Sequence, residues 1–264
     1  MLPKAKKRFG QHFLTDRHYI DRIVKAIAPQ RDDVMVEIGP GPGAITAPLL
    51  ERLDHLHAVE IDRHLAAALR ERFPDTQFTL HEEDVLEFDF GKLGGRFRAV
   101  GNLPYNISTP FLFHLAGFAE RLIDGTFMLQ KEVVDRMVAA PDTDAYGRLS
   151  VMLQYRFGMR RLFDVPPGAF TPPPKVDSAI VRMVPLPEDR LRAKDDGRFA
   201  AVVTAGFGQR RKTLNNTMKT FLTTEQINAL GIDPKRRAET LSLEEFIAVA
   251  NASLADTVSG KGAT

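Results

Sequence analysis

The sequence predicts a doubly wound α/β domain, built on a seven-stranded and mostly parallel sheet, followed by a small all-helical domain. Three features indicate this arrangement. Short apolar runs alternate with amphipathic stretches from Val34 to about Gln130, which is typical of successive βα units. Two further apolar stretches flank a proline-rich loop between Val165 and Lys175. Beyond Pro185, the periodic segments have helical spacing.

The first strands and helices follow from the spacing of apolar residues. Strands are expected where short apolar or β-branched runs occur, at Val34–Ile38, Leu56–Ile61, Gln77–Leu80, Ala99–Asn102 and Thr126–Gln130. Helices are expected where apolar residues recur every three to four positions, at Ala44–Leu53, His64–Phe73, Thr109–Phe118 and Glu132–Val138. Ahead of them, Asp16 is expected to cap a helix that runs through Ala28.

The end of the sheet and the domain boundary follow from the later part of the chain. After a helix at Tyr146–Gln154, the stretches Arg160–Val165 and Ser178–Val184 are expected to form two final strands in a hairpin-like arrangement. The run Pro185–Asp189 then breaks regular structure. We therefore expect an α/β domain over residues 1–187 and a helical domain over residues 188–264. Its helices are expected at Phe199–Phe207, Leu214–Phe221, Thr224–Leu230 and Leu243–Leu254.

The composition argues against several classes of protein. The 264 residues are 44% hydrophobic, yet no stretch approaches the roughly 18 apolar residues of a membrane span. The sequence begins with basic, polar residues and no apolar signal segment, so we expect a cytoplasmic protein, and we expect a monomer. Cysteine is absent and the histidines show no ligand spacing, which argues against disulfides, a thiol nucleophile and a metal site.

A glycine-rich turn follows the first expected strand and indicates a nucleotide site. Gly39, Gly41 and Ala44 match the G-x-G-x-x-A pattern of dinucleotide-binding turns, so an NAD-dependent enzyme is one alternative. Pro40 and Pro42 remove two backbone N–H donors from the loop that would bind a pyrophosphate. The turn therefore favours a nucleoside-like cofactor without phosphate, such as S-adenosylmethionine. A glycine turn that binds no ligand is the remaining alternative.

Two acidic residues stand at successive strand ends behind this turn. Glu60 follows the second strand at about the distance where an acid binds a ribose. Asp84 follows the third strand, where a carboxylate can accept from the exocyclic amino group of an adenine. Taken without its neighbours, Asp84 is equally well interpreted as a helix cap or a solvated loop residue. Together the two acids favour a cofactor that carries an adenosine.

Asn102-Leu103-Pro104-Tyr105 ends the fourth strand and has the groups that can hold an amino group on a flat base. The Asn102 amide oxygen and the Leu103 carbonyl can both accept hydrogen bonds, Pro104 fixes the backbone, and Tyr105 offers an aromatic face. The string therefore predicts a catalytic site that methylates an amino group of a nucleobase. A strand-ending turn with a core tyrosine is the alternative.

Basic residues are clustered although the formal net charge is only +2. The clusters expected to contact nucleic-acid phosphates are Lys6-Lys7-Arg8 and Arg210-Arg211-Lys212, with a third candidate at Lys235–Arg237. Phosphate contacts gain from local positive charge whatever the total, and they weaken as salt rises. A solvated surface is the alternative for each cluster, and a domain interface is a further alternative for Arg210–Lys212.

Motifs along nearly the whole chain resemble those of the 16S ribosomal RNA adenine dimethyltransferase family. They lie at Lys7–Leu14, Glu37–Gly43, Val59–Asp62, Asp84–Leu86, Asn102–Tyr105, Gln130–Val133, Tyr146–Ser150, Phe170–Ser178 and Phe207–Leu214. The resemblance implies a class I S-adenosylmethionine-dependent fold, which is Rossmann-like, with a helical C-terminal domain that contacts RNA or the ribosomal subunit. It also implies transfer of two methyl groups to N6 of each of two adjacent adenines near the 3′ end of 16S rRNA, in the immature small subunit.

The resemblance assigns roles to single residues as well. The cofactor-binding residues that it implies are His12, Leu14, Gly39, Gly41, Glu60, Asp84 and Asn102. It implies that Phe170 stacks on the target base opposite Tyr105, whereas a hydrophobic anchor is the alternative for a loop phenylalanine beside prolines. His12 departs from the family pattern, in which asparagine is frequent at this position, although an imidazole can also donate and accept hydrogen bonds.

Two other functions share part of these features. Enzymes that methylate adenine in large-subunit rRNA share the cofactor turn and the Asn102–Tyr105 string, whereas the strings Phe170–Ser178 and Phe207–Leu214 favour the small-subunit type. An alternative from another class is a ribosome-assembly checkpoint factor that acts mainly by binding immature subunits.

Overall fold

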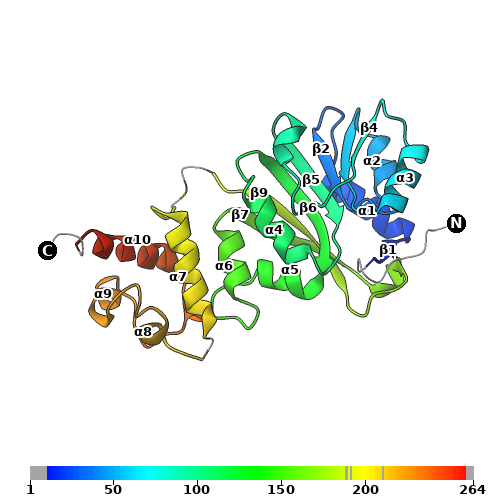
Figure 1. Cartoon of the computed structure of the whole chain (residues 1–264). Coiled ribbons are helices and arrows are strands. Elements are labelled where there is room, and N and C mark those ends of the chain that lie inside the picture. Colours follow the sequence, from blue (N-terminus) through cyan, green and yellow to red (C-terminus); the bar gives the residue numbers. More distant parts are fainter. Residues whose placement is uncertain (1–10, 188–189, 191, 210, 260–264) are drawn as a thin grey trace. The chain divides into compact units, whose positions relative to one another are not determined.

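The computed structural model describes residues 11–187, 190, 192–209 and 211–259, which divide into two compact units (Figure 1). The first unit contains the described residues of Met1–Val134 and the segment Phe157–Pro185. The second contains Asp135–Arg156 and the described residues after Pro185. The predicted ranges, 1–187 and 188–264, differ from this division because residues 135–156 group with the C-terminal helices rather than with the sheet.

A seven-stranded sheet forms the centre of the first unit (Figure 1). Its strands, in spatial order, are β4 (Phe78–His81), β3 (Leu56–Val59), β2 (Met35–Ile38), β5 (Phe97–Asn102), β6 (Leu122–Gln130), β9 (Ser178–Pro185) and β7 (Phe157–Val165). β9 is antiparallel to both of its neighbours, and the other neighbouring pairs are parallel. The predicted doubly wound architecture is therefore confirmed. Its chain order reverses between β2 and β5, where ligands of such sheets bind beyond the carboxyl ends of the strands.

Helices cover both faces of this sheet. The central strands carry buried side chains on both faces, because successive residues of a strand point to opposite sides. α1 (Arg17–Ile27), α2 (Thr46–Leu50) and α3 (Arg63–Arg72) share one core cluster with strand residues that include Met128. On the opposite face, Phe111 of α4 (Ser108–Ala116) contacts Phe127, with 5.4 Å between the ring centroids. As predicted, the Asp16 side chain caps α1 by accepting from the His18 backbone N–H. α2 is shorter than the predicted helix over residues 44–53.

A second, two-stranded sheet joins the N-terminal segment to the proline-rich loop. β1 (Phe13–Leu14) pairs antiparallel with β8 (Phe170–Thr171), after the short η3 (Pro167–Ala169). The backbone N–H groups of residues 15 and 16 also donate to the Ala169 carbonyl, at 2.9 and 3.2 Å. The sequence did not predict these two strands. They hold the start of the described chain against a loop that lies more than 150 residues later in the sequence.

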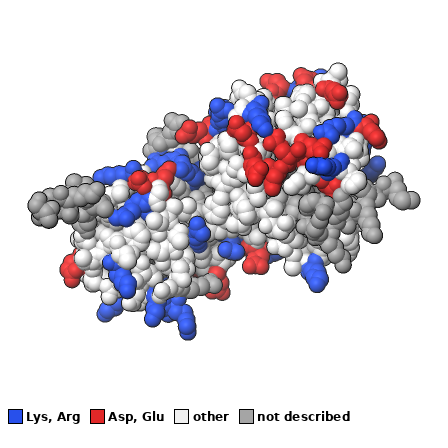
Figure 2. Space-filling model, viewed as in Figure 1, with Lys and Arg blue, Asp and Glu red and all other residues white. Residues whose placement is uncertain are grey.

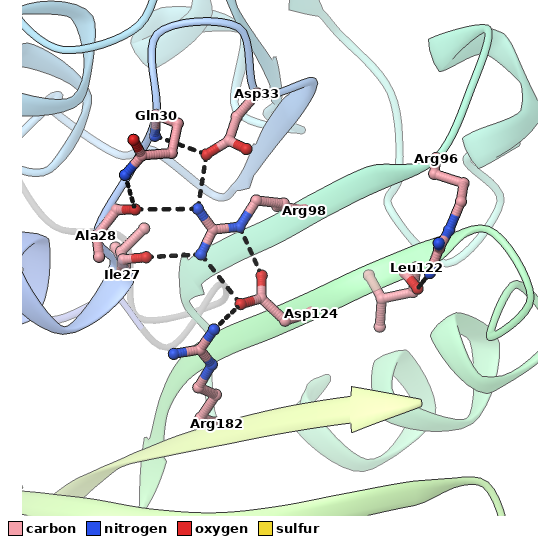
Figure 3. A network of polar contacts seen from close by, with 9 residues as sticks. All are labelled: Ile27, Ala28, Gln30, Asp33, Arg96, Arg98, Leu122, Asp124 and Arg182. Carbon is pink, nitrogen blue, oxygen red and sulfur yellow. Dashed lines mark hydrogen bonds and ion pairs between the residues drawn. The ribbon is translucent and has the colours of Figure 1, made fainter. Parts of the chain in front are cut away.

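An ion-pair network closes the amino end of the parallel strands (Figure 3). Arg98 of β5 donates to both carboxylate oxygens of Asp124 on β6, at 2.7 and 3.0 Å, and to Asp33 at 2.6 Å. It also donates to the carbonyl oxygens of Ile27 and Ala28, at 2.6 and 3.2 Å, where α1 ends. These contacts use all five guanidinium N–H donors. The buried charge is therefore fully paired, and the network links α1 to the centre of the sheet.

The second unit is built from helices. Its elements are the end of α5 (Lys131–Met137), α6 (Arg148–Gln154), α7 (Asp196–Gly208), α8 (Leu214–Thr217), α9 (Thr224–Ala229), η4 (Ala238–Thr240) and α10 (Leu243–Ser259). Tyr155, directly after α6, stacks on Phe199 of α7 with 4.1 Å between the ring centroids, and both belong to one buried cluster. This packing explains why residues 135–156 belong here. Within the described ranges, no helix has the length and hydrophobicity of a membrane span.

Candidate active site

A cavity of about 340 Å³ lies at the carboxyl ends of β2, β3, β4 and β5. Short loops after these strands and the segment before β1 form its wall. Of the predicted cofactor-binding and catalytic residues, those that line it are His12, Leu14, Gly39, Gly41, Glu60, Asp84, Asn102, Leu103, Pro104 and Tyr105. The fold thus brings together residues that lie in five separate parts of the sequence.

The glycine turn after β2 has the backbone conformation that its sequence predicts. Gly39 and Gly41 have φ of 62° and 57°, in the left-handed region that side chains disfavour. The Gly39 N–H donates to the carbonyl of Val59 at 2.9 Å, which ties the turn to the end of β3. A Cβ atom on Gly41 would lie 3.5 Å from the ring of Phe13. The glycines therefore give the turn a backbone conformation that other residues rarely adopt, and Pro40 and Pro42 line the cavity between them.

Glu60 lies behind this turn and connects it to the loop after β3. One carboxylate oxygen accepts from the Gly41 N–H at 3.2 Å, and the other accepts from the Asp62 N–H at 2.9 Å. Only 5% of the residue's surface is exposed, and this burial raises the pKa of the carboxyl. Glu60 therefore fixes the turn and also presents an acceptor to the cavity.

Glu37 also lines the cavity, although it was not among the predicted site residues. It lies within β2, is 2% exposed, and accepts a hydrogen bond from Thr46 Oγ1 at 2.6 Å. Burial is the largest cause that raises its pKa to about 7, and the nearby charge of Glu60 acts in the same direction. An acid inside an otherwise apolar strand was the available signal, because such a residue is rarely buried without a reason.

The charged side chains that line the cavity in the described structure are all acidic. Its lining includes the acids Glu37, Glu60, Glu83 and Asp84 and, among the described residues, no lysine or arginine. Asp84 accepts a hydrogen bond from the Leu86 N–H at 2.9 Å. This contact is of the capping kind that was the alternative interpretation of Asp84. The described part of the chain holds no group of three or more His, Cys, Asp or Glu placed to bind a metal. Glu83 pairs with Lys92 at 3.0 Å outside this lining. The carboxylate oxygens of the other three acids suit a ligand that carries positive charge and hydroxyl or amino donors.

Asn102 ends β5 with its side chain fixed by the N-terminal segment. Its amide Nδ2 donates to the His12 carbonyl at 3.1 Å, which turns the amide oxygen away from that contact. The strand beneath it is packed tightly, because a Cβ on Gly101 would lie 2.6 Å from the Ile38 carbonyl oxygen. The following Leu103 N–H donates to the Met128 carbonyl at 3.1 Å. Strand pairing on both sides thus fixes the position of this amide.

Tyr105 is half-buried at the cavity wall, and both its ends are held. Its hydroxyl is hydrogen-bonded to Ser178 Oγ at 3.0 Å, and burial raises its pKa. The ring lies against the His12 imidazole, with 5.7 Å between the centroids and 28° between the planes. The simple alternative of a core tyrosine does not describe this residue, because it lines the cavity.

The prediction that Phe170 offers a stacking face to the target base is not supported by its packing. Phe170 is 4% exposed, lies in the same core cluster as Leu14 and Val165, and does not line the cavity. Its backbone pairs with Leu14 in the β1–β8 sheet, which directs the ring into the core. The hydrophobic-anchor alternative therefore fits this residue.

Comparison with known proteins agrees with this site. A model of the family described as ribosomal RNA adenine dimethylase matches residues 2–254. The chain belongs to this family. A relative from Aromatoleum aromaticum, named ribosomal RNA small subunit methyltransferase A, is 61% identical over 94% of each chain. The protein of that name from Bordetella pertussis is 56% identical over 96% of this chain and 95% of its own length.

Solved structures show the same fold. A dimethyladenosine transferase from Plasmodium falciparum superimposes with a TM-score of 0.78 at 23% identity, over 90% of this chain and 96% of its own. The 23S rRNA methyltransferase ErmE gives 0.72 at 25% identity, over 91% and 98%. This ribosomal RNA adenine dimethylase has a class I methyltransferase fold and is an S-adenosylmethionine-dependent enzyme. The NAD-dependent alternative is therefore wrong.

Only two of the six predicted RNA-binding residues belong to the described part of the chain. Lys6, Lys7, Arg8 and Arg210 fall outside the described residues. Arg211 and Lys212 are exposed between α7 and α8. In the third cluster, Arg236 pairs with Glu245 at 2.5 Å and donates to the Thr240 carbonyl at 2.6 Å, so it has a structural role in its own unit.

Proposed function

We propose that this dimethylase transfers methyl groups from S-adenosylmethionine to N6 of two adjacent adenines near the 3′ end of 16S rRNA, four methyl groups in all. The observation that carries the proposal is the position of Asn102, whose amide is anchored by His12 at the wall of the acidic cavity. The small-subunit names of relatives that match 94% of the chain and more support this choice of rRNA over the large-subunit alternative.

In this proposal, the carboxyl ends of β2, β3 and β4 bind the cofactor. Gly39 and Gly41 allow it to approach the backbone, Glu60 accepts from the ribose hydroxyls, and Asp84 accepts from the adenine amino group. Leu14 supplies an apolar contact from β1. When bound, the sulfonium supplies an already activated methyl group. The carboxylates of the cavity fit its positive charge, because the described residues of the lining include no lysine or arginine.

The acceptor residues act mainly by orientation. Asn102 Oδ1 and the Leu103 carbonyl accept from the two N–H groups of the adenine N6, which turns the nitrogen lone pair toward the methyl group. Pro104 holds this turn, and Tyr105 stacks on the base. Because burial raises the pKa of Tyr105, its hydroxyl is not a base near neutral pH. After transfer, S-adenosylhomocysteine would be the leaving group, and the methylated N6, now strongly acidic, would release one proton to water.

For a second methylation, the same acceptors hold only one remaining hydrogen. The site must then also accommodate the first methyl group, so we expect a pocket somewhat larger than adenine itself requires. The target base must also leave its stack, as bases modified at an amino group generally do.

The helical unit and the basic N-terminal segment are proposed to contact the RNA. Figure 2 shows Lys and Arg side chains spread over the visible face of the helical unit, whereas acidic side chains gather on the first unit. The exposed residues Arg211 and Lys212 belong to the helical unit. Positive charge of this kind favours phosphate contact and makes binding dependent on salt. The natural substrate is then rRNA inside the immature small subunit, with the protein acting as a cytoplasmic monomer.

The test is to incubate purified protein with labelled S-adenosylmethionine and, in parallel, with immature small subunits, mature small subunits, and large subunits. We expect N6,N6-dimethyladenosine in digests of the immature small-subunit rRNA. Its absence there, with label in the large subunit instead, would favour the large-subunit alternative. Assembly-factor action is tested separately, by asking whether an Asn102→Ala variant still binds precursor subunits and changes their maturation.

A further inference from the structure

Two arginines lie on the face of the large sheet that α1 covers, at its antiparallel edge. Arg160 of β7 and Arg182 of β9 are direct cross-strand partners, so their side chains stand on the same face of the sheet. Ile180, two residues before Arg182, shares a core cluster with α1, and residues two apart on a strand have the same orientation. Arg160 is exposed, and so is Val184, the next residue of β9 on this face. The apolar cover of the sheet therefore ends before these two arginines.

Arg22 of α1 brings a third guanidinium to this face. Its Cζ lies 3.9 Å from the centroid of the Phe163 ring, and Phe163 is the β7 partner of Ile180. Because Ile180 and Arg182 are two residues apart, the positions opposite them, Phe163 and Arg160, are separated along the strand by roughly 7 Å. Arg22 is exposed. We call Arg22, Arg160 and Arg182 the arginine face, and all three belong to the first unit.

Acidic residues compensate the charge of only one of these arginines. Arg182 donates to Asp124 at 2.5 Å and belongs to the network at the amino end of the strands, in which two aspartates balance two arginines (Figure 3). Arg22 and Arg160 form no ion pair with the described part of the chain. Like charges directly opposite each other on paired strands are unfavourable for folding. The position of Arg160 beside Arg182 therefore indicates a ligand of negative charge.

Arg182 retains donors in spite of its contact with Asp124. Its Nε is buried and has no hydrogen-bond partner among the described residues. Only one of its terminal nitrogens donates to Asp124, and Figure 3 shows the other pointing away from that carboxylate. That nitrogen can donate to a ligand that lies beside Arg160.

We propose that the arginine face is a further contact surface for ribosomal RNA, separate from the cavity, and that it binds phosphate groups of the rRNA backbone. This inference rests on the proposed function, because that function makes rRNA the anion that the chain must bind. Guanidinium groups present paired N–H donors that match phosphate oxygens. A phosphate between Arg160 and Arg182 also offsets the repulsion between them. A cost in the stability of the free protein is thus recovered when RNA binds.

The first test measures filter binding of immature small subunits, without cofactor, at several salt concentrations. Arg22→Gln and Arg160→Gln each remove one charge and keep a polar side chain. Arg31→Gln is the matched control, because Arg31 has a side chain that is 78% exposed in the same unit but pairs with Asp54. We expect each of the two substitutions to weaken binding roughly fivefold at about 150 mM salt, and to lower the slope of log Kd against log salt by about 1. The control should change neither value.

Urea unfolding separates binding from a structural role. Because Arg160 lies opposite a like charge, Arg160→Gln should leave the midpoint of unfolding unchanged or raise it. The affinity for S-adenosylhomocysteine should stay within about twofold of the wild type in both variants, since the arginine face does not line the cavity. A lower midpoint with unchanged subunit binding would identify a structural role and overturn the inference.

The second test uses the absence of cysteine from the chain. Arg160→Cys introduces a single thiol, to which an iron–EDTA group is attached, and the hydroxyl radicals that this group generates cleave RNA close to it. Glu87→Cys, at an exposed position after β4, is the control. At saturating protein, we expect stronger cleavage of 16S rRNA from position 160 than from position 87.

Two results would contradict this account of the arginine face. Unchanged affinity and salt slope in both arginine variants would show that no phosphate is bound there. Weaker binding with cleavage no stronger from position 160 than from position 87 would indicate a protein of the subunit as the partner. Both differ from failure of the proposed function, in which the wild-type protein itself forms no dimethyladenosine.

Discussion

At the amino end of the parallel strands, Arg98 uses every N–H donor on two carboxylates and two carbonyls, and Asp124 also accepts from Arg182 at 2.5 Å. At the carboxyl end of the same sheet, Glu37 and Glu60 are also buried, but they face a cavity whose described lining contains no lysine or arginine. The first arrangement compensates its charges internally. The second leaves acceptors for something that the protein must bind.

This difference shows how a single sheet separates stability from function. Buried charges are tolerated when paired, and removing one partner is costly. Uncompensated carboxylates shift their pKa instead, as Glu37 does, and such perturbed groups gather at functional sites. Substitutions at the amino end should therefore change the free energy of unfolding, and substitutions at the carboxyl end should change binding or transfer.

The largest effect is expected at the amino end, for Asp124→Asn. This change leaves Arg98 and Arg182 without their shared carboxylate, and we expect it to lower the free energy of unfolding by about 3–5 kcal/mol. Urea unfolding measures this loss. The control is Asp54→Asn, which breaks an exposed ion pair with Arg31 at 3.2 Å and should cost less than about 1 kcal/mol. Equal losses in the two variants would contradict the comparison.

At the carboxyl end, Asn102→Ala should act on the reaction instead. Loss of the amide acceptor is expected to lower the rate of methyl transfer by about 10²–10³-fold, the effect typical of one positioned hydrogen-bonding group. Single-turnover labelling of immature small subunits measures the rate. A variant that unfolds in the same urea range as wild type but keeps full activity would show that Asn102 only ends a strand.

The buried carboxyl of Glu37, at the carboxyl end of the strands, should make the stability of the protein depend on pH. The pKa of Glu37 is about 7 in the folded state and 4.5 ordinarily. The free energy of unfolding of the wild type therefore falls as the pH rises from 4.5 through 7, because the folded state resists ionisation. The Glu37→Gln variant cannot ionise at this position. We expect equal stability at pH 4.5 and a variant that is up to about 3 kcal/mol more stable at pH 8, by urea unfolding at both pH values. Glu51→Gln, at an exposed position, should show no such difference.

A smaller effect is expected in the histidine pair on β3 and β4. His57 Nδ1 and His81 Nε2 lie 3.3 Å apart, and burial, followed by nearby His55 and His81, lowers the His57 pKa to about 4. The folded state therefore resists protonation, and its stability falls as the pH drops from 6.5 toward 4. His57→Asn should reduce this fall in thermal melts. The exposed His64→Asn should leave the acid-induced fall unchanged.

Much of the sheet and the cofactor side of the site could be predicted from the sequence. Apolar periodicity predicted the seven strands, and the acids that follow β3 and β4 do line one cavity, because the carboxyl ends of parallel strands meet at one edge. The glycine turn was predicted for a different reason, because Gly39 and Gly41 adopt a left-handed backbone that other residues rarely adopt.

The remaining features depend on contacts between distant residues. Two-residue strands such as Phe13–Leu14 and Phe170–Thr171 carry no periodicity, so neither their pairing nor the burial of Phe170 could be predicted. Arg98 and Asp124 are single charges inside apolar strands, and each is explained only by the other. Residues 135–156 precede the last two strands of the large sheet in the chain, so their position in the sequence favours the first unit and not the C-terminal helices. Their place in the helical unit depends on stacking of Tyr155 on Phe199.

The most direct test of the central claim measures cofactor binding and methyl transfer together in Glu60→Gln and Asn102→Ala. Glu60 is expected to hold the cofactor, so Glu60→Gln should weaken S-adenosylmethionine binding by roughly 10- to 100-fold in calorimetry. Asn102→Ala should bind the cofactor nearly as wild type does and yet fail in single-turnover transfer to immature small subunits. The opposite pattern, with cofactor binding lost in Asn102→Ala and kept in Glu60→Gln, would contradict the division of this cavity into a cofactor side and an acceptor side.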